Sequence, residues 1–220
     1  MIYGINANSF IDYPGEISFV IFTGGCNFNC PYCHNSDIVN KNTKIYSEEE
    51  ILNMLKERQK FIAAVTITGG EPTIYGEQLI NLIKKIKNAG YKIKLDTNGS
   101  NASLLKKIID SNLVNYIAMD IKNTFAKYQI TAGKKINIDE IKKSINLIEN
   151  SKIEYEFRTT INKTMHTEND IKEIISYIKD INKYTLQPYR YSKQQIVDTD
   201  FEAWTETEIE DIMNKLKVSV

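Results

Sequence analysis

The sequence predicts an α/β fold in which helices cover a parallel sheet. Short β-rich segments alternate with longer segments whose apolar residues recur at helical spacing, and six strand–helix units can be counted, the last with an irregular connection. Glycine-rich and polar residues follow the predicted strands, whereas the helix-to-strand connections are plainer. No low-complexity tract, linker or repeat interrupts the pattern, so a single domain over residues 1–220 is expected.

Each predicted strand and helix rests on a local signal in the sequence. The first strand, at 17–22, is alternating and β-branched, and a glycine-rich cysteine loop follows it. Residues 47–50 form a capping box that begins a helix, and a buried strand at 62–68 ends at two glycines. Apolar residues from 79 to 86 predict a helix that ends at Gly90. The remaining strands are expected at 91–95, 116–119, 153–160 and 184–186, and the remaining helices at 104–109, 138–148, 167–181 and 206–216.

Two closures of this sheet fit the pattern. One is a doubly wound open sheet, and the other is an incomplete (β/α) barrel, because a full barrel needs about 250 residues. In both, functional groups gather at the carboxyl ends of the strands. The segments that follow the predicted strands are polar or glycine-rich, namely Gly-Gly-Cys at 24–26, Gly-Gly-Glu-Pro at 69–72, Asp-Thr-Asn-Gly at 96–99, Asp-Ile-Lys at 120–122 and Arg-Thr-Thr at 158–160. We therefore predict one site along this rim.

Composition narrows the classes of function. The chain has 28 Lys+Arg and 28 Asp+Glu, so it is not a generally basic nucleic-acid binder, and no nucleic-acid partner is expected. No apolar run approaches the roughly 18 residues of a membrane span, and the start does not resemble a signal peptide, so no membrane association is expected. The three cysteines are odd in number and lie within eight residues, which argues against a disulfide framework and for a reducing, cytoplasmic location.

The three cysteines form a C-x3-C-x2-C loop after the first predicted strand, at Cys26, Cys30 and Cys33. A structural zinc ion needs a fourth ligand, and His34 directly follows Cys33, where it is poorly placed for the same ion. A redox pair of Cys30 and Cys33 leaves Cys26 without a role. Iron–sulfur ligation fits better, because a four-iron cluster normally takes four cysteines and three would leave one iron open. Zinc, a redox pair and purely structural thiols remain as alternatives.

The loop carries an aromatic residue, Tyr32, before its third cysteine, and so resembles the radical S-adenosylmethionine superfamily, whose fold is a full or partial (β/α) barrel. Further segments at 12–15, 22–26, 33–35, 69–72, 94–99, 118–122 and 155–160 occur in order. Together they resemble the activating proteins of anaerobic ribonucleoside-triphosphate reductase, a group close to the pyruvate formate-lyase activating enzymes, over residues 5–190. The resemblance implies a partial (β/α)6 TIM-like barrel, open on one side, with an extra C-terminal helix.

The resemblance also implies a set of cofactors. Cys26, Cys30 and Cys33 would be the catalytic and metal-binding residues that hold a 4Fe–4S cluster, whose open iron binds S-adenosylmethionine. One electron from the cluster would cleave this cofactor to methionine and a 5′-deoxyadenosyl radical. A monovalent cation is a further candidate.

Several residues are expected to contact S-adenosylmethionine. Gly69 and Gly70 would let the backbone approach its methionyl group, Glu71 would receive its ammonium or hold the turn, and Tyr32 would lie beside adenine. The other expected contacts come from the strand ends, at Asp96, Thr97, Asp120, Lys122, Arg158 and Gln187.

The histidines and the last strand add three expectations. His34 and Asn35 are expected to buttress the cysteine loop, and His166 is predicted to lie at the surface near a helix start. Arg190 stands where related activases have a histidine that meets the cofactor, so Gln187 or Arg190 is the candidate to replace it.

The leading functional hypothesis is a glycyl-radical-enzyme activase that removes a hydrogen atom from one glycine of a partner protein. Anaerobic ribonucleotide reductase is the expected partner, and flavodoxin or ferredoxin is the expected electron donor. The alternatives are an activase of pyruvate formate-lyase or another glycyl radical enzyme, a radical enzyme acting on a small molecule or peptide, and a non-catalytic metal-binding interaction module. The chain has no cysteine beyond the three, which disfavours branches with auxiliary clusters.

Overall fold

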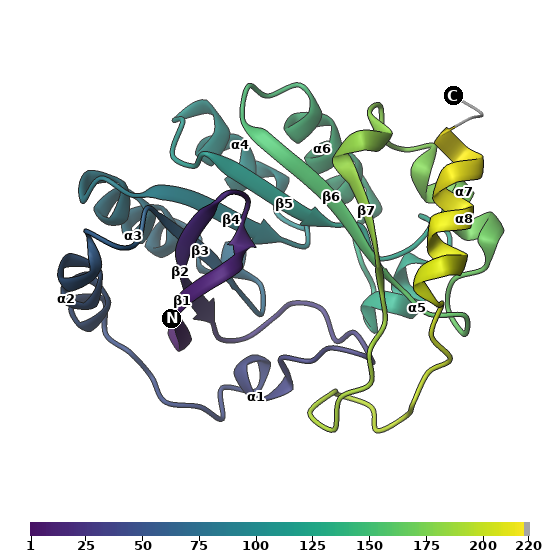
Figure 1. The fold of residues 1–220 in the computed structure, drawn as a ribbon, viewed down its shortest axis with the longest axis horizontal. Helices are drawn as coiled ribbons and strands as arrows, with labels where there is room; N and C mark the ends of the chain where they lie inside the picture. The colour runs from purple at the N-terminus through teal and green to yellow at the C-terminus, as the bar shows by residue number, and fades with distance from the viewer. Residues whose placement is uncertain (218–220) are drawn as a thin grey trace.

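A seven-stranded sheet runs through the molecule in the computed structural model, which describes residues 1–217 (Figure 1). The strands follow one another in chain order across the sheet, as β1 (Ile2–Tyr13), β2 (Glu16–Thr23), β3 (Ala64–Gly69), β4 (Lys92–Thr97), β5 (Tyr116–Asp120), β6 (Glu154–Ile161) and β7 (Tyr184–Pro188). Only the β1–β2 pair is antiparallel, and the other five pairs are parallel. β1 and β7 are the two edges, so the sheet is open, as the predicted partial barrel requires. The predicted fold class is confirmed.

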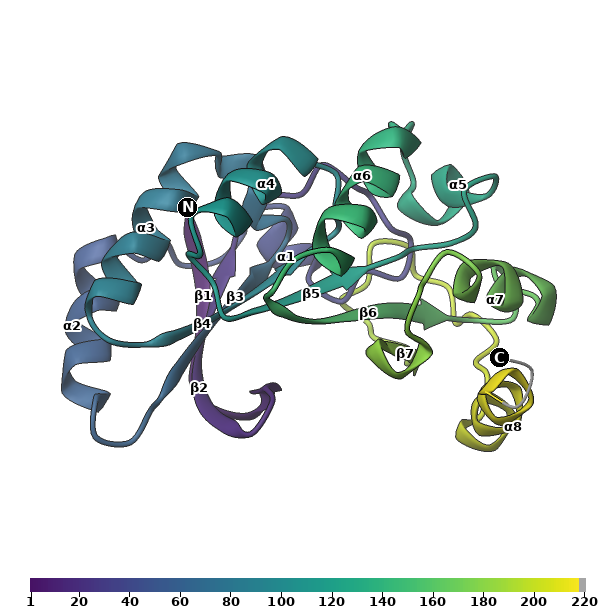
Figure 2. The same cartoon turned by 90° about the horizontal axis from the view of Figure 1, so that it is seen from above.

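Helices α2 (Glu48–Arg58), α3 (Glu77–Asn88), α4 (Ala102–Asp110) and α6 (Ile138–Glu149) line one face of the sheet (Figure 2). Their apolar stripes account for this placement, since α3 buries five apolar side chains, Leu79, Ile80, Leu82, Ile83 and Ile86. Side chains also cap the helices, and Ser47 and Glu50 form the predicted capping box at the start of α2. The other helices are α1 (Ser36–Val39), α5 (Tyr128–Ala132), α7 (Glu168–Ile175), α8 (Glu206–Lys217) and two 3-10 turns, η1 (Pro72–Tyr75) and η2 (Ile181–Lys183). None of the helices in the described part of the chain combines the length and apolarity needed to cross a membrane.

The structure differs from the sequence-based prediction at several elements: the prediction lacks β1, the short helices α1 and α5 and the two 3-10 turns, and it makes one helix too long. β1 was not predicted, because its polar residues, such as Asn6 and Asn8, and its register shifts against β2 hide the alternation of a strand. The helix predicted at 167–181 ends at Ile175, and the chain continues with tight turns in which the amides of Tyr177 and Ile178 bond three residues back.

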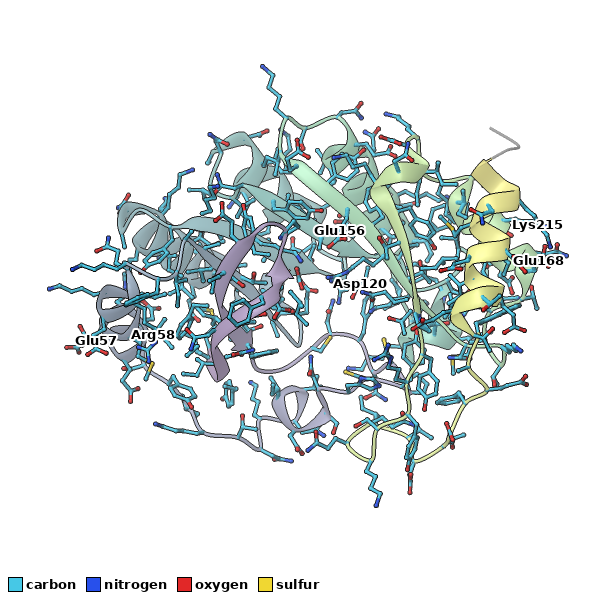
Figure 3. The ribbon with its side chains drawn as sticks, viewed as in Figure 1. Glu57, Arg58, Asp120, Glu156, Glu168 and Lys215 are labelled. Atoms are coloured by element: carbon cyan, nitrogen blue, oxygen red, sulfur yellow. The ribbon has the colours of Figure 1, made fainter. Side chains whose placement is uncertain are left out.

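The two faces of the sheet differ in polarity. On the helix-covered face, alternate strand residues such as Phe19, Ile67 and Ile117 are fully buried in the apolar core. On the opposite, concave face, the parallel register brings charged residues together: Asp120 pairs with Arg158, and Asp96 and Glu156 lie on either side of Ala118. Figure 3 shows Asp120 near the centre of the molecule, in that view between the β1–β2 hairpin and β7. The charged side chains of the concave face therefore lie near the carboxyl ends of the strands.

Candidate functional site

A cavity of roughly 300 Å³ lies at the carboxyl ends of the strands. Its walls include all thirteen residues that the sequence predicts for the site, namely Cys26, Cys30, Tyr32, Cys33, Gly69, Gly70, Glu71, Asp96, Thr97, Asp120, Lys122, Arg158 and Gln187. These residues come from the cysteine loop and from the ends of β3 to β7, so the parallel sheet brings together segments far apart in sequence.

The cysteine loop, residues 24–35, connects β2 to α1. All three cysteines are free; Cys30 is buried, and Cys26 and Cys33 are half-buried. Burial raises the pKa of Cys26 to about 12 and also raises that of Cys30. A bare thiolate is therefore disfavoured here, and ionisation of these thiols needs a compensating cation such as a metal.

The two glycines at the end of β3, Gly69 and Gly70, pack against the backbone of the cysteine loop and β2. A Cβ on Gly70 would lie 1.8 Å from the carbonyl oxygen of Gly25, and one on Gly69, whose φ is +116°, would lie 2.4 Å from the amide nitrogen of Thr23. The amide of Gly70 also donates to the Thr23 carbonyl at 2.8 Å. A side chain at either position would collide with the protein's own backbone, so both positions require glycine.

Both oxygens of the Glu71 carboxylate accept hydrogen bonds from the protein. Its Oε1 accepts from the amide and hydroxyl of Thr73 at 3.0 and 2.6 Å and from the hydroxyl of Thr97 at 2.8 Å. Its Oε2 accepts from the Asn98 amide at 2.6 Å. The residue is 1% exposed, and this burial raises the pKa of the carboxyl. Of the two roles considered for Glu71, the geometry matches the one that holds the turn.

A network of ion pairs lies beside the cysteines. Asp120 accepts from the Lys122 ammonium at 3.0 Å and from Nε of Arg158 at 2.9 Å. Burial alone would raise the pKa of Asp120, but the positive charges of Arg158 and Lys122 outweigh it and hold that pKa well below its usual range. Nη2 of Arg158 also lies 3.4 Å from Oδ2 of Asp96. Oδ1 of Asp96 is buried and lies 3.5 Å from the Lys94 ammonium.

Sequence reasoning missed the inner part of this network. The Lys94 ammonium donates to the carbonyl of Asp12 at 2.8 Å and lies 3.5 Å from Asp96 and 3.4 Å from Glu156. The overlooked signal is that β4 and β6 carry charged residues at alternate positions. Strands of a parallel sheet are usually apolar on both faces, so these charges indicate a face that is not part of the apolar core. Figure 3 labels Glu156, which lies close to Asp120 in that view.

An aromatic cluster closes the side of the cavity next to β7. The hydroxyl of Tyr32 donates to the carbonyl of Thr160 at 3.2 Å, and its buried ring makes edge contacts with Tyr189 and Phe201. The chain after β7 passes beside the cysteine loop (Figure 1), where the amide of Val197 donates to the carbonyl of Pro31 at 2.9 Å.

The polar neighbours of the cysteines tie the loop to its surroundings. Nε2 of His34 lies 2.5 Å from the carbonyl of Arg190, and the amide side chain of Asn35 donates to the Gly69 carbonyl at 3.0 Å. The Arg190 side chain is 78% exposed and reaches Glu206, whereas Gln187 lines the cavity. Only Gln187 of these two candidates therefore faces the site.

The prediction of a surface position for His166 is wrong. The residue is 0% exposed, because the turn after β6 folds the ring against the main chain of the loop that follows β5. The single cue available, a histidine just before a helix start, does not reveal such a long-range contact.

Comparison with known proteins places this geometry in a family. The pattern of the radical SAM superfamily matches residues 20–181. A protein of Methanocaldococcus jannaschii assigned to the glycyl-radical enzyme activating enzymes is 35% identical over 193 residues, which cover 86% of this chain and 80% of that protein. The pyruvate formate-lyase-activating enzyme of Clostridium pasteurianum is 29% identical over 86% of this chain and 81% of its own length. The structure of Streptococcus suis SuiB bound to S-adenosylmethionine shares the fold, with a TM-score of 0.67 and 16% identity over 90% of this chain and 46% of that one.

The residues present fit the cofactors of this superfamily. No three His, Cys, Asp or Glu side chains within residues 1–217 are grouped to hold a single metal ion. A 4Fe–4S cluster is a larger body in which each thiolate binds its own iron, and the three free thiols line one cavity together with the charged side chains of Asp96, Asp120, Lys122 and Arg158. The predicted use of an iron–sulfur cluster with S-adenosylmethionine is confirmed at the level of the family. The chain belongs to the radical SAM superfamily, as an enzyme related to the glycyl-radical enzyme activating enzymes.

Proposed function

We propose that this protein activates a glycyl radical enzyme, and that Cys26, Cys30 and Cys33 hold the cluster while the rest of the cavity wall binds S-adenosylmethionine. One observation carries the proposal: three free thiols and a buried network of charges line the same cavity. When bound, the cluster and S-adenosylmethionine supply one-electron chemistry that ends in removal of a hydrogen atom from a substrate carbon.

The charged side chains suit the zwitterionic methionine end of S-adenosylmethionine. Lys122 and Arg158 offer cationic donors for its carboxylate, and the Asp96 carboxylate, which lines the cavity, offers an acceptor for its ammonium or for a ribose hydroxyl. A monovalent cation beside Asp96 or Asp120 is the alternative use of the same oxygens.

The remaining wall residues orient the cofactor rather than bind its charges. Glu71 and Thr97 bond to each other and hold the loops after β3 and β4 together. Tyr32 lies on the side of the cavity proposed for adenine, and Gln187 is the wall residue proposed to replace the histidine of related activases that meets the methionine end of the cofactor.

The proposed substrate is a glycine-bearing loop of the partner enzyme. The sheet has free edges at β1 and β7, and an open barrel leaves room for a segment of another protein to approach the cavity. The motif set favours anaerobic ribonucleotide reductase as the partner, flavodoxin or ferredoxin as the electron donor and the cytoplasm as the location. Pyruvate formate-lyase is the second candidate partner, favoured by the similarity to the Clostridium pasteurianum enzyme.

Anaerobic reconstitution with iron and sulfide tests the chemistry. With dithionite and S-adenosylmethionine, the wild-type protein should form 5′-deoxyadenosine and methionine, and Cys30→Ala should not. Phe61→Ala is a matched control, because Phe61 is an exposed residue outside the cavity wall. A reconstituted wild-type protein that forms no 5′-deoxyadenosine, or anaerobic preparations that contain one zinc and no iron, would instead support a non-catalytic metal-binding module.

The partner is tested separately by electron paramagnetic resonance. The activated protein is mixed with anaerobic ribonucleotide reductase or with pyruvate formate-lyase, and a glycyl radical signal is sought on each. A signal on ribonucleotide reductase alone supports the first assignment, and a signal on pyruvate formate-lyase alone replaces it. If neither enzyme gives a signal while a small molecule or peptide becomes labelled from deuterated S-adenosylmethionine, the substrate class is wrong.

A further inference from the structure

His166 lies behind the cavity wall, in the turn between β6 and α7. Its side chain is completely buried, although the residue follows a strand end in a loop. His166 does not line the cavity. Within the described residues, its ring makes no hydrogen bond to a cysteine or a carboxylate of the site. A buried histidine needs partners for both ring nitrogens, so those partners indicate what the residue does.

The two hydrogen bonds of the ring define its protonation. The main-chain amide of Asn162 donates to Nδ1 at 3.3 Å, so Nδ1 is the acceptor of a neutral ring. Nε2 therefore carries the proton and donates it to the carbonyl oxygen of Lys122 at 2.9 Å. Burial lowers the pKa of His166, which favours this neutral form.

The contact with Lys122 joins the turn after β6 to the loop that follows β5. Lys122 is the residue whose ammonium contacts Asp120 on the cavity wall. The next residue, Asn123, is held from the same turn, since its side chain donates to the carbonyl of Met165 at 3.1 Å. On the other side, the amide of Ile121 donates to the carbonyl of Arg158 at 2.8 Å. The backbone that carries Lys122 is therefore fixed from β6 at one end and from the turn 162–166 at the other.

We propose that His166 is a positioning residue for S-adenosylmethionine binding: its Nε2–H fixes the backbone at Lys122 and so aims the Lys122 ammonium into the cavity. This rests on the proposed function, in which Lys122 receives the cofactor carboxylate. The imidazole is suited to the task because it is rigid and presents one acceptor and one donor on opposite sides, one to its own turn and one to the neighbouring loop.

A purely structural role is the competing explanation. The carbonyl of His166 accepts from the Trp204 indole at 3.2 Å, which ties down the C-terminal segment. That bond uses the main chain and survives replacement of the ring. The bond between Asn162 and Nδ1 is likewise local to the turn, so only the bond to Lys122 connects the side chain with the site.

Two substitutions separate the two ring nitrogens. In His166→Asn, the amide oxygen can take the place of Nδ1, but the side chain is too short to reach Lys122. In His166→Gln, the amide nitrogen can take the place of Nε2 and keep the donation to Lys122. The protein is reconstituted with its cluster in the oxidised state, and two quantities are measured without turnover: amide hydrogen exchange over residues 121–124 and the Kd for S-adenosylmethionine by calorimetry.

We expect His166→Asn to speed exchange over residues 121–124 and to weaken S-adenosylmethionine binding by about tenfold, with His166→Gln within about threefold of wild type in both. Equal behaviour of the two variants in both measurements would overturn the positioning role. If His166→Asn speeds exchange while Lys122→Met binds as tightly as wild type, the positioning of the loop stands and the proposed carboxylate contact of Lys122 fails. Nitrogen NMR of histidine-labelled wild-type protein adds a test that needs no variant: the Nε2–H tautomer supports the proposal, and the Nδ1–H tautomer overturns it.

Discussion

Replacement of Glu71 by glutamine tests whether this residue holds two loops together or binds the cofactor. The Glu71 carboxylate accepts four hydrogen bonds, and two of the donors are the main-chain amides of Thr73 and Asn98. Glutamine keeps the shape but replaces one oxygen with an NH2 group. The NH2 group must then face at least one of these main-chain amides. Both groups are donors, so that buried amide loses its acceptor.

The cost can be estimated from the bonds lost. A charge-assisted hydrogen bond contributes about 1.5–3 kcal/mol, and a buried amide left without an acceptor costs about 1–3 kcal/mol. The substitution also removes a buried charge, which burial disfavours and which offsets part of this loss. We therefore expect a net loss of about 2–4 kcal/mol in the free energy of unfolding, or roughly 5–15 °C in the melting temperature of a chain of this size.

The measurement is thermal and urea unfolding of the protein without cofactors, followed by calorimetric binding of S-adenosylmethionine to the reconstituted protein. Glu77→Gln is the matched control, because Glu77 is an exposed residue whose only ion pair, within the described residues, is with Lys107 at the surface, and its loss should leave the melting temperature almost unchanged. A Glu71→Gln protein that melts with the Glu77→Gln control but binds S-adenosylmethionine much more weakly would refute the inference, because its carboxylate would then serve the cofactor directly.

Three further changes have expected outcomes. Gly70→Ala places a Cβ against the carbonyl of Gly25, so urea unfolding should show a loss of about 1–3 kcal/mol or more; a neutral result would mean that the two loops separate at no cost. Asp120→Asn should flatten the pH dependence of stability. The folded pKa of Asp120 lies below its unfolded value, which is about 4, so the pairing of Asp120 with Arg158 stabilises the fold above that pH and is lost as the pH falls below it. The difference in the free energy of unfolding between wild type and variant should therefore narrow from pH 7 to pH 3. Parallel pH profiles of the two proteins would contradict this. Arg190→Ala should leave S-adenosylmethionine affinity unchanged, since its side chain is exposed and outside the cavity; a tenfold loss would give Arg190 the role of the histidine it replaces.

The strand ends were predictable because two local signals coincide there. A buried strand followed by glycines or carboxylates marks a carboxyl end, and parallel strands bring such ends to one rim. For this reason the sequence alone assigns Asp96 and Asp120, which are 24 positions apart, to one site, and both line the cavity. β1 lacks the corresponding signal, since an antiparallel edge strand with bulges alternates poorly.

The partner of each side chain was not predictable, because it depends on contacts between distant segments. Gly70 was assigned to close approach of a cofactor, yet it is also required by the carbonyl of Gly25, 45 positions away. The sequence allows two roles for Glu71, and its contacts with Thr97 and Asn98 favour the one that holds the turn. The position of His166 just before a helix start gives no sign of its burial, which depends on the carbonyl of a residue 44 positions earlier.

The charges on the concave face follow from the openness of the sheet. A closed eight-stranded barrel fills its interior with layers of apolar side chains, whereas an open sheet of seven strands leaves that face for a site. Here the face carries three cations and three carboxylates in mutual contact, Lys94, Lys122, Arg158, Asp96, Asp120 and Glu156. Buried charges are tolerated only when they are paired, so removal of any one leaves its neighbours uncompensated. Because the set is neutral as a whole, a ligand group that carries both an ammonium and a carboxylate can enter it without adding net charge, and a group that carries only one of them cannot.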